Sequence, residues 1–186
     1  GILEVANVAH NVLGDKATRL LGKAMHYGSG GLVPLWTPSL PRPVRKNEKQ
    51  TAMEYGAVNG LKGLQDKRVV YFPSCLNQRL GSGKKPLIND MTELLNKAGY
   101  EVIFPQNMEN LCCGTIWESK GMPEIAEKKV KELEDALWKA SDGGRYPVVC
   151  DQSPCLHRMK SNMTKVRLYE SAEFVWTFLK DRLTFN

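Results

Sequence analysis

The sequence predicts an α/β protein in which a parallel sheet of βαβ units, flanked by helices, follows a helical and proline-rich N-terminal extension. From about residue 67 onward, short runs rich in β-branched and aromatic residues alternate with longer stretches of helical periodicity, as in parallel sheets with covering helices. Cysteines follow these β-rich runs, whereas residues 1–66 show no such alternation. We therefore expect an N-terminal helix and Pro-rich strap at 1–66 and a cysteine-rich domain at 67–186.

The first part begins with an amphipathic helix at about residues 3–25, because apolar side chains recur there at steps of three and four. The Gly-Ser-Gly-Gly run at 28–31 is expected to end that helix. Four prolines between residues 32 and 50 fix φ and remove backbone donors, so this segment is expected to be an extended strap. A short helix is expected at 51–64, although the three glycines within it lower its helical propensity.

The second part is expected to contain four strands and three helices. Pro123 suits the first position of a helix, Gly99 suits the end of one, and Ser171 is a good N-cap for the last. The expected strands are 68–73, 101–104, 146–150 and 165–169, and the expected helices are 86–98, 123–140 and one that follows Ser171.

The composition is that of a soluble globular protein, with 42% apolar and 25% charged residues in a chain of 186. Much of the net charge of +6 comes from residues 1–50, and we interpret it as a solvated face rather than a nucleic-acid site, because Lys/Arg runs and interleaved aromatics are lacking. No stretch approaches the roughly 20 apolar residues of a transmembrane segment, and the N-terminus has no signal-peptide pattern. We expect a cytoplasmic protein, or one bound peripherally at the inner membrane face.

Five cysteines are the candidate metal ligands, and their odd number excludes complete pairing as disulfides. The five are Cys75, Cys112, Cys113, Cys150 and Cys155. Because they follow predicted parallel strands, they are expected to meet at the carboxyl edge of the sheet. Neighbouring side chains on an extended strand point to opposite faces, so the vicinal pair reaches one centre only if the backbone turns sharply. Gly114 permits such a turn, since it has no Cβ to clash at positive φ.

Thiolates from separate strand ends can serve several functions. Four or five of them suit an iron–sulfur cluster or a zinc ion. The wide spacing excludes a bacterial ferredoxin motif, whose cysteines lie only a few residues apart. A redox dithiol, such as Cys75 with Cys112, is another alternative, and simple burial as small apolar residues is the last. The residues by themselves leave these alternatives open.

Three motifs surround the cysteines, and two more lie upstream. The three are Pro73-Ser74-Cys75, Asn110-Leu111-Cys112-Cys113-Gly114 with Glu118-Ser119-Lys120-Gly121, and Val148-Val149-Cys150-Asp151-Gln152-Ser153-Pro154-Cys155. They resemble the cysteine-rich CCG domain found in heterodisulfide reductase and in the iron–sulfur subunits of glycolate oxidase and anaerobic glycerol-3-phosphate dehydrogenase. With Gly22-Lys23-Ala24-Met25 and Pro41-Arg42-Pro43, they are most similar to the C-terminal part of FAD-linked D-lactate dehydrogenases.

The resemblance implies a [4Fe–4S] iron–sulfur cluster, which is non-cubane in some members of the family. Four cysteines match the family's ligand pattern: Cys75, Cys112, Cys113 and Cys155. The chain departs from the family's final Cys-x-x-Cys, because Gln152 stands where the first of these cysteines is expected. Cys150, two positions earlier, is therefore kept as a fifth candidate metal ligand. Zinc is the alternative metal, and FAD is expected only in the parent protein.

The resemblance also implies a function, namely an iron–sulfur electron-transfer domain of a flavin-linked oxidoreductase that acts on D-lactate or a similar 2-hydroxy acid. Expected partners are the flavin and ferredoxin-like domains of the parent protein, a second CCG repeat, and a quinone or cytochrome acceptor. Because the chain begins with Gly and holds one repeat, we expect a fragment that is inactive alone. The alternatives are a zinc-stabilised or metal-free subunit-docking domain and a dithiol/disulfide redox domain.

Overall fold

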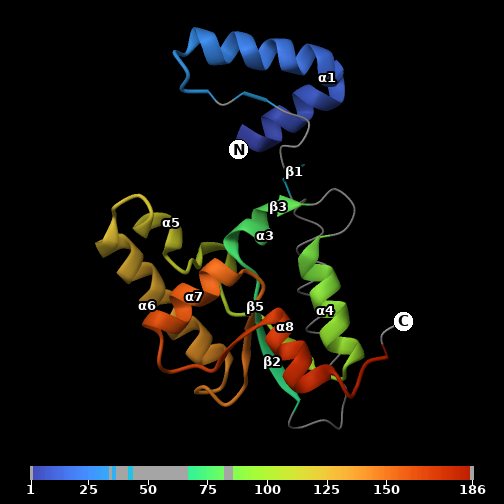
Figure 1. The fold of residues 1–186 in the computed structure, drawn as a ribbon, viewed down its shortest axis with the longest axis vertical. Coiled ribbons are helices and arrows are strands. Elements are labelled where there is room, and N and C mark those ends of the chain that lie inside the picture. Colours follow the sequence, from blue (N-terminus) through green and yellow to red (C-terminus); the bar gives the residue numbers. More distant parts are fainter. Residues whose placement is uncertain (1, 34, 37–41, 44–66, 82–85, 185–186) are drawn as a thin grey trace.

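The computed structural model describes residues 2–33, 35–36, 42–43, 67–81 and 86–184. Its body is a four-stranded sheet in the order β4-β2-β5-β6, with every neighbouring pair parallel and helices on both faces (Figure 1). This architecture confirms the predicted α/β class. The strands are β2 (Arg68–Phe72), β4 (Glu101–Ile103), β5 (Val148–Cys150) and β6 (Leu168–Glu170).

Strand β2 lies inside the sheet and is buried on both faces, which explains its continuous apolar sequence. Successive side chains of a strand point to opposite faces. Val70 and Phe72 accordingly pack in one hydrophobic core, and Val69 and Tyr71 pack in the other. The sheet therefore separates two cores, and the carboxyl ends of β2 and β5 lie side by side because Phe72 is the register partner of Cys150.

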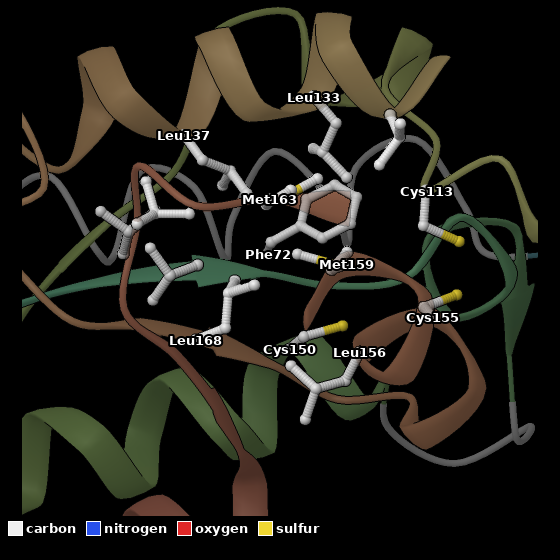
Figure 2. Packing of buried hydrophobic residues seen from close by; sticks show 14 of the residues in the cluster. Phe72, Cys113, Leu133, Leu137, Cys150, Cys155, Leu156, Met159, Met163 and Leu168 are labelled. Atoms are coloured by element: carbon white, nitrogen blue, oxygen red, sulfur yellow. The ribbon is translucent and has the colours of Figure 1, made fainter. Parts of the chain in front are cut away.

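Two helices cover each face of the sheet. They are α4 (Leu87–Lys97), α6 (Pro123–Ala140), α7 (Ser153–Asn162) and α8 (Ser171–Phe174). Leu133 and Leu137 of α6 and Met159 of α7 pack against the core that contains Phe72 (Figure 2). Leu95 of α4 and Phe174 of α8 lie in the opposite core. Both faces of the sheet are thus closed by helices, of which the periodicity predicted α4, α6 and α8.

The boundaries of α6 match the prediction, with Pro123 at its start. The predicted N-cap Ser171 is wrong: Glu170 caps α8, and Glu173 completes a capping box with it, because carboxylates accept hydrogen bonds from free helix N–H groups. Helix α8 continues into a π-helical turn, Val175–Leu179. Neither α7 nor the short helix α3 (Cys75–Arg79) was predicted from the sequence.

The N-terminal extension begins with α1 (Ile2–Gly28), which ends at the predicted glycine run and is interrupted at Gly14, where the backbone leaves helical geometry. Strand β1 (Arg42–Pro43) pairs antiparallel with β3 (Leu80–Gly81) and so joins the extension to the segment after Cys75. The predicted helix at 51–64 and most of the strap lie outside the described residues. Among the helices in the described part of the chain, none combines the length and hydropathy needed to cross a bilayer.

Candidate metal centre

Three chain segments bring cysteines to the carboxyl edge of the sheet. Cys75 is the first residue of α3 and follows β2, and Cys155 lies in the first turn of α7 after β5. The pair Cys112–Cys113 follows β4 through a short 3₁₀ turn, Met108–Asn110. This is the edge at which open parallel sheets place their functional sites.

The first cysteine segment is fixed by hydrogen bonds to Asp151, the residue after β5. The amide of Ser74 donates to Asp151 Oδ1 over 2.8 Å, and the buried Tyr71 hydroxyl donates to Oδ2 over 2.8 Å. Ser74 also caps α3, because its Oγ accepts from the Asn77 amide at 3.2 Å. Asp151 thus ties the backbone beside Cys75 to the third cysteine segment.

The second segment turns sharply at Gly114, as predicted. Gly114 has φ +89°, and an added Cβ would lie 2.5 Å from the carbonyl oxygen of Ala126 in α6. The Gly114 amide donates to Cys112 Sγ at 3.4 Å, and Cys113 Sγ lies 3.2 Å from Thr115 Oγ1. The turn therefore needs glycine both for its backbone conformation and for its closeness to α6.

Arg158 of α7 holds this turn from the core side. Its Nε donates to the carbonyl oxygen of Cys113 over 3.0 Å. Its Nη1 forms an ion pair with Glu118, at the end of α5 (Thr115–Glu118). The Arg158 side chain is only 8% exposed, whereas that of Glu118 is 58% exposed, so the guanidinium is the buried member of the pair.

Four thiols interact in series, in the order Cys75, Cys112, Cys113, Cys155. Hydrogen bonding with Cys112 lowers the pKa of Cys75 to about 6, despite its partial burial. Hydrogen bonds with Cys112 and Cys155 also lower the pKa of Cys113 strongly, and the same bonds raise the pKa of each of those two partners. The pKa is thus lowered at Cys75 and Cys113 and raised at Cys112 and Cys155, because a hydrogen bond between two thiols favours the thiolate on one sulfur and the protonated form on the other.

Cys150 occupies a different position from the other four. It is the last residue of β5, has no exposed surface, and its thiol donates weakly to the Gln152 carbonyl oxygen at 3.8 Å. Burial raises the pKa of Cys150 to about 12. Figure 2 shows Cys150 beside Leu156 in the core, with Cys113 and Cys155 at the margin.

Within the described ranges, no three His, Cys, Asp or Glu side chains are arranged as a preformed metal-ion group. The thiols interact pairwise, so binding requires them to turn toward a common centre and to lose their remaining protons. The donor set suits such a centre, because soft thiolates from three loops are the ligands of zinc and of iron–sulfur clusters. The arrangement also suits dithiol chemistry, since Cys75 is partly exposed and its pKa is lowered.

The polar residues that hold these loops were not predicted from the sequence. Asp151 carried one signal, since it directly follows a strand that ends in cysteine. Arg158 carried none, because α7 was not predicted and its partner Glu118 lies far away in sequence. Lys120, which lies in one of the motifs, is exposed.

Comparison with known proteins identifies the family of this domain. No curated protein and no solved structure matches the chain. A family model of the CCG cysteine-rich domain matches residues 69–160, which contain all five cysteines. Residues 69–160 of this chain therefore belong to the CCG cysteine-rich domain family.

Proposed function

We propose that residues 67–186 form an electron-transfer domain that binds an iron–sulfur cluster within a flavin-linked oxidoreductase acting on D-lactate or a similar 2-hydroxy acid. One observation carries the cluster proposal: four thiols from three separate segments interact in series at one sheet edge. The ligands we propose are Cys75, Cys112, Cys113 and Cys155. The resemblance to D-lactate dehydrogenases supports the substrate class.

The chain's own residues would hold the cluster and set its electronic environment. When bound, an iron–sulfur cluster supplies one-electron transfer, and hydrogen bonds to sulfur, charge and burial tune its potential. The Gly114 amide already donates to Cys112 Sγ, and Thr115 Oγ1 lies within hydrogen-bond distance of Cys113 Sγ. In the parent protein, we propose that electrons reach this domain from FAD through a ferredoxin-like domain and leave to a quinone or cytochrome.

Anaerobic reconstitution of the full chain with iron and sulfide tests this proposal. We expect bound iron, acid-labile sulfide and an EPR signal in one of its redox states. Cys155→Ser should lose the cluster, whereas Cys150→Ser is the matched control, because its thiol is not part of the series. Stoichiometric zinc without sulfide would favour the docking domain, and a cluster lost equally in both variants would add Cys150 to the ligands.

A dithiol function is the second candidate, and the lowered pKa of the partly exposed Cys75 favours it. The Cys75 thiolate would attack a substrate disulfide, form a mixed disulfide and release one thiol. Cys112 would then displace the second thiol, leaving a Cys75–Cys112 disulfide and a substrate reduced by two electrons. Stoichiometric reduction of a small disulfide by metal-free protein, abolished in Cys112→Ser, would support this function over the first.

A further inference from the structure

Arg158 contacts the turn at Cys112–Gly114, here called the paired-cysteine turn, but it is not one of the proposed ligands. We infer that Arg158 is the positioning residue for the Cys112–Cys113 pair, holding both sulfur atoms in place for the proposed metal centre. This inference rests on the proposed function, because it assigns a role to Arg158 within the same site. It follows from the geometry of one guanidinium and the two groups that this guanidinium binds.

The guanidinium binds both ends of a short segment that begins at the second cysteine of the pair. Its Nε donates to the Cys113 carbonyl oxygen over 3.0 Å, and its Nη1 pairs with Glu118. Between these points lie Gly114 and the single turn of α5. A planar guanidinium offers donors in a fixed fork, so it fixes the orientation of the segment as well as its distance.

The turn is enclosed on two sides, which makes its position sensitive to Arg158. A Cβ placed on Gly114 would meet the Ala126 carbonyl oxygen at 2.5 Å and Arg158 Nε at 3.1 Å. The backbone of α6 therefore forms one wall, and Arg158 forms the other. Removal of the guanidinium opens the second wall and leaves the Cys113 carbonyl without its donor from α7.

Arg158 also connects two proposed ligand segments through a single helix. It lies three residues after Cys155 on α7, and residues three apart lie on the same side of a helix. The helix that supplies the fourth thiol thus also holds the second and third.

The pairing with Glu118 explains how a nearly buried cation is tolerated. An unpaired buried charge is strongly unfavourable, whereas a hydrogen-bonded and paired one is acceptable. Glu118 reaches Arg158 from the protein surface, since its side chain is 58% exposed. Glu118→Gln should therefore weaken the hold on the turn without removing the hydrogen bond to Cys113.

The test compares Arg158→Gln, Arg158→Lys and Glu118→Gln with a matched control on the same helix, Lys160→Gln. Lys160 is exposed and pairs with Glu173, so the control removes a cation of α7 that does not contact the turn. The first readout is a titration of the full chain with Co²⁺, monitored by the thiolate-to-cobalt charge-transfer absorption. We expect Arg158→Gln to bind about 10- to 100-fold more weakly, a loss typical of groups that orient metal ligands.

Arg158→Lys should recover only part of the affinity, because lysine supplies the charge without the planar fork. Glu118→Gln should show a smaller loss in the same direction, and Lys160→Gln should bind as the wild type does. Circular dichroism at the titration temperature confirms that each variant is folded. Wild-type affinity in Arg158→Gln, or equal losses in Arg158→Gln and Lys160→Gln, would overturn the inference.

A second readout needs no metal and separates this inference from the proposed function. In metal-free protein, the rate at which a maleimide labels Cys112 and Cys113 reports how firmly the turn is held. We expect Arg158→Gln to raise that rate at least several-fold and Lys160→Gln to leave it unchanged. If the wild type binds neither Co²⁺ nor a cluster, the proposed function fails, and the labelling rates still decide whether Arg158 positions the pair. Equal rates in all variants would refute the role of Arg158.

Discussion

Replacement of Gly114 by alanine tests whether the paired-cysteine turn depends on close packing against α6. Two effects add at this position. A non-glycine residue in the left-handed region costs about 1–2 kcal/mol. The new Cβ would also lie 2.5 Å from the backbone oxygen of Ala126, a contact that forces the turn or α6 to move. Overpacking of this kind costs about 1–3 kcal/mol, so we expect a total loss of about 2–5 kcal/mol.

Gly121→Ala is the matched control for this prediction. Gly121 also has a positive φ, +72°, but no atom lies within 4 Å of the position its Cβ would take. Only the conformational cost applies there, so we expect a loss of about 1–2 kcal/mol. The difference between the two variants isolates the steric contact with α6.

Urea unfolding of metal-free protein under reducing conditions, monitored by circular dichroism, measures the free energy of unfolding of both variants. Thermal unfolding should agree: a difference of about 1–3 kcal/mol lowers the Tm of Gly114→Ala by about 2–12 °C more than that of Gly121→Ala in a chain of this size. Equal losses in the two variants would refute the steric argument. They would mean that the turn moves away from α6 at little cost.

Three further predictions concern the thiols and their supports. In metal-free protein at pH 7.5, iodoacetamide should modify Cys75 well before Cys150, and peptide mass spectrometry measures the order. The reason is that hydrogen bonding with Cys112 lowers the pKa of Cys75 to about 6, whereas burial raises the pKa of Cys150 to about 12. Asp151→Ala should cost about 1–3 kcal/mol in urea unfolding, because it leaves the buried Tyr71 hydroxyl and one backbone amide without their acceptor. Burial raises the pKa of Tyr71 in the folded protein, so its contribution to the free energy of unfolding is complete below the pKa of an unfolded tyrosine, near pH 10, and is lost as the pH rises above it. Tyr71→Phe should therefore flatten the alkaline decline of the free energy of unfolding with pH. An unchanged slope would contradict this.

The parallel sheet was predictable because its signals are local and repeated. The buried run Arg68–Phe72 and the helix Pro123–Ala140 carry period, length and end signals that agree with one another. The convergence of cysteines followed from topology, since parallel strands place their carboxyl ends at one edge. A pattern of this kind predicts which thiols meet at the edge but not how they interact there.

The elements that were not predicted from the sequence depend either on partners far away along the chain or on a choice between adjacent residues. Helix α7 begins soon after β5, and its sequence is largely polar, so its periodicity is weak. The role of Arg158 requires Glu118 and Cys113, which lie about 40 residues away along the chain. The cap of α8 was assigned one residue too late, because serine and glutamate both accept from helix N–H groups and only the coordinates distinguish them.

The register of β2 with β5 has a consequence for the order of assembly. Val70 pairs with Val148, so the two central strands meet only after a long intervening stretch of chain has closed, and such non-local pairing slows folding. Cys75 and the Cys112–Cys113 pair follow β2 and β4, which pair directly with each other, so Cys155 is the thiol that joins the others only after that closure. If the proposed metal centre needs all four thiols, a nascent chain that ends before β5 cannot complete it, because Cys155 lies on the helix after that strand.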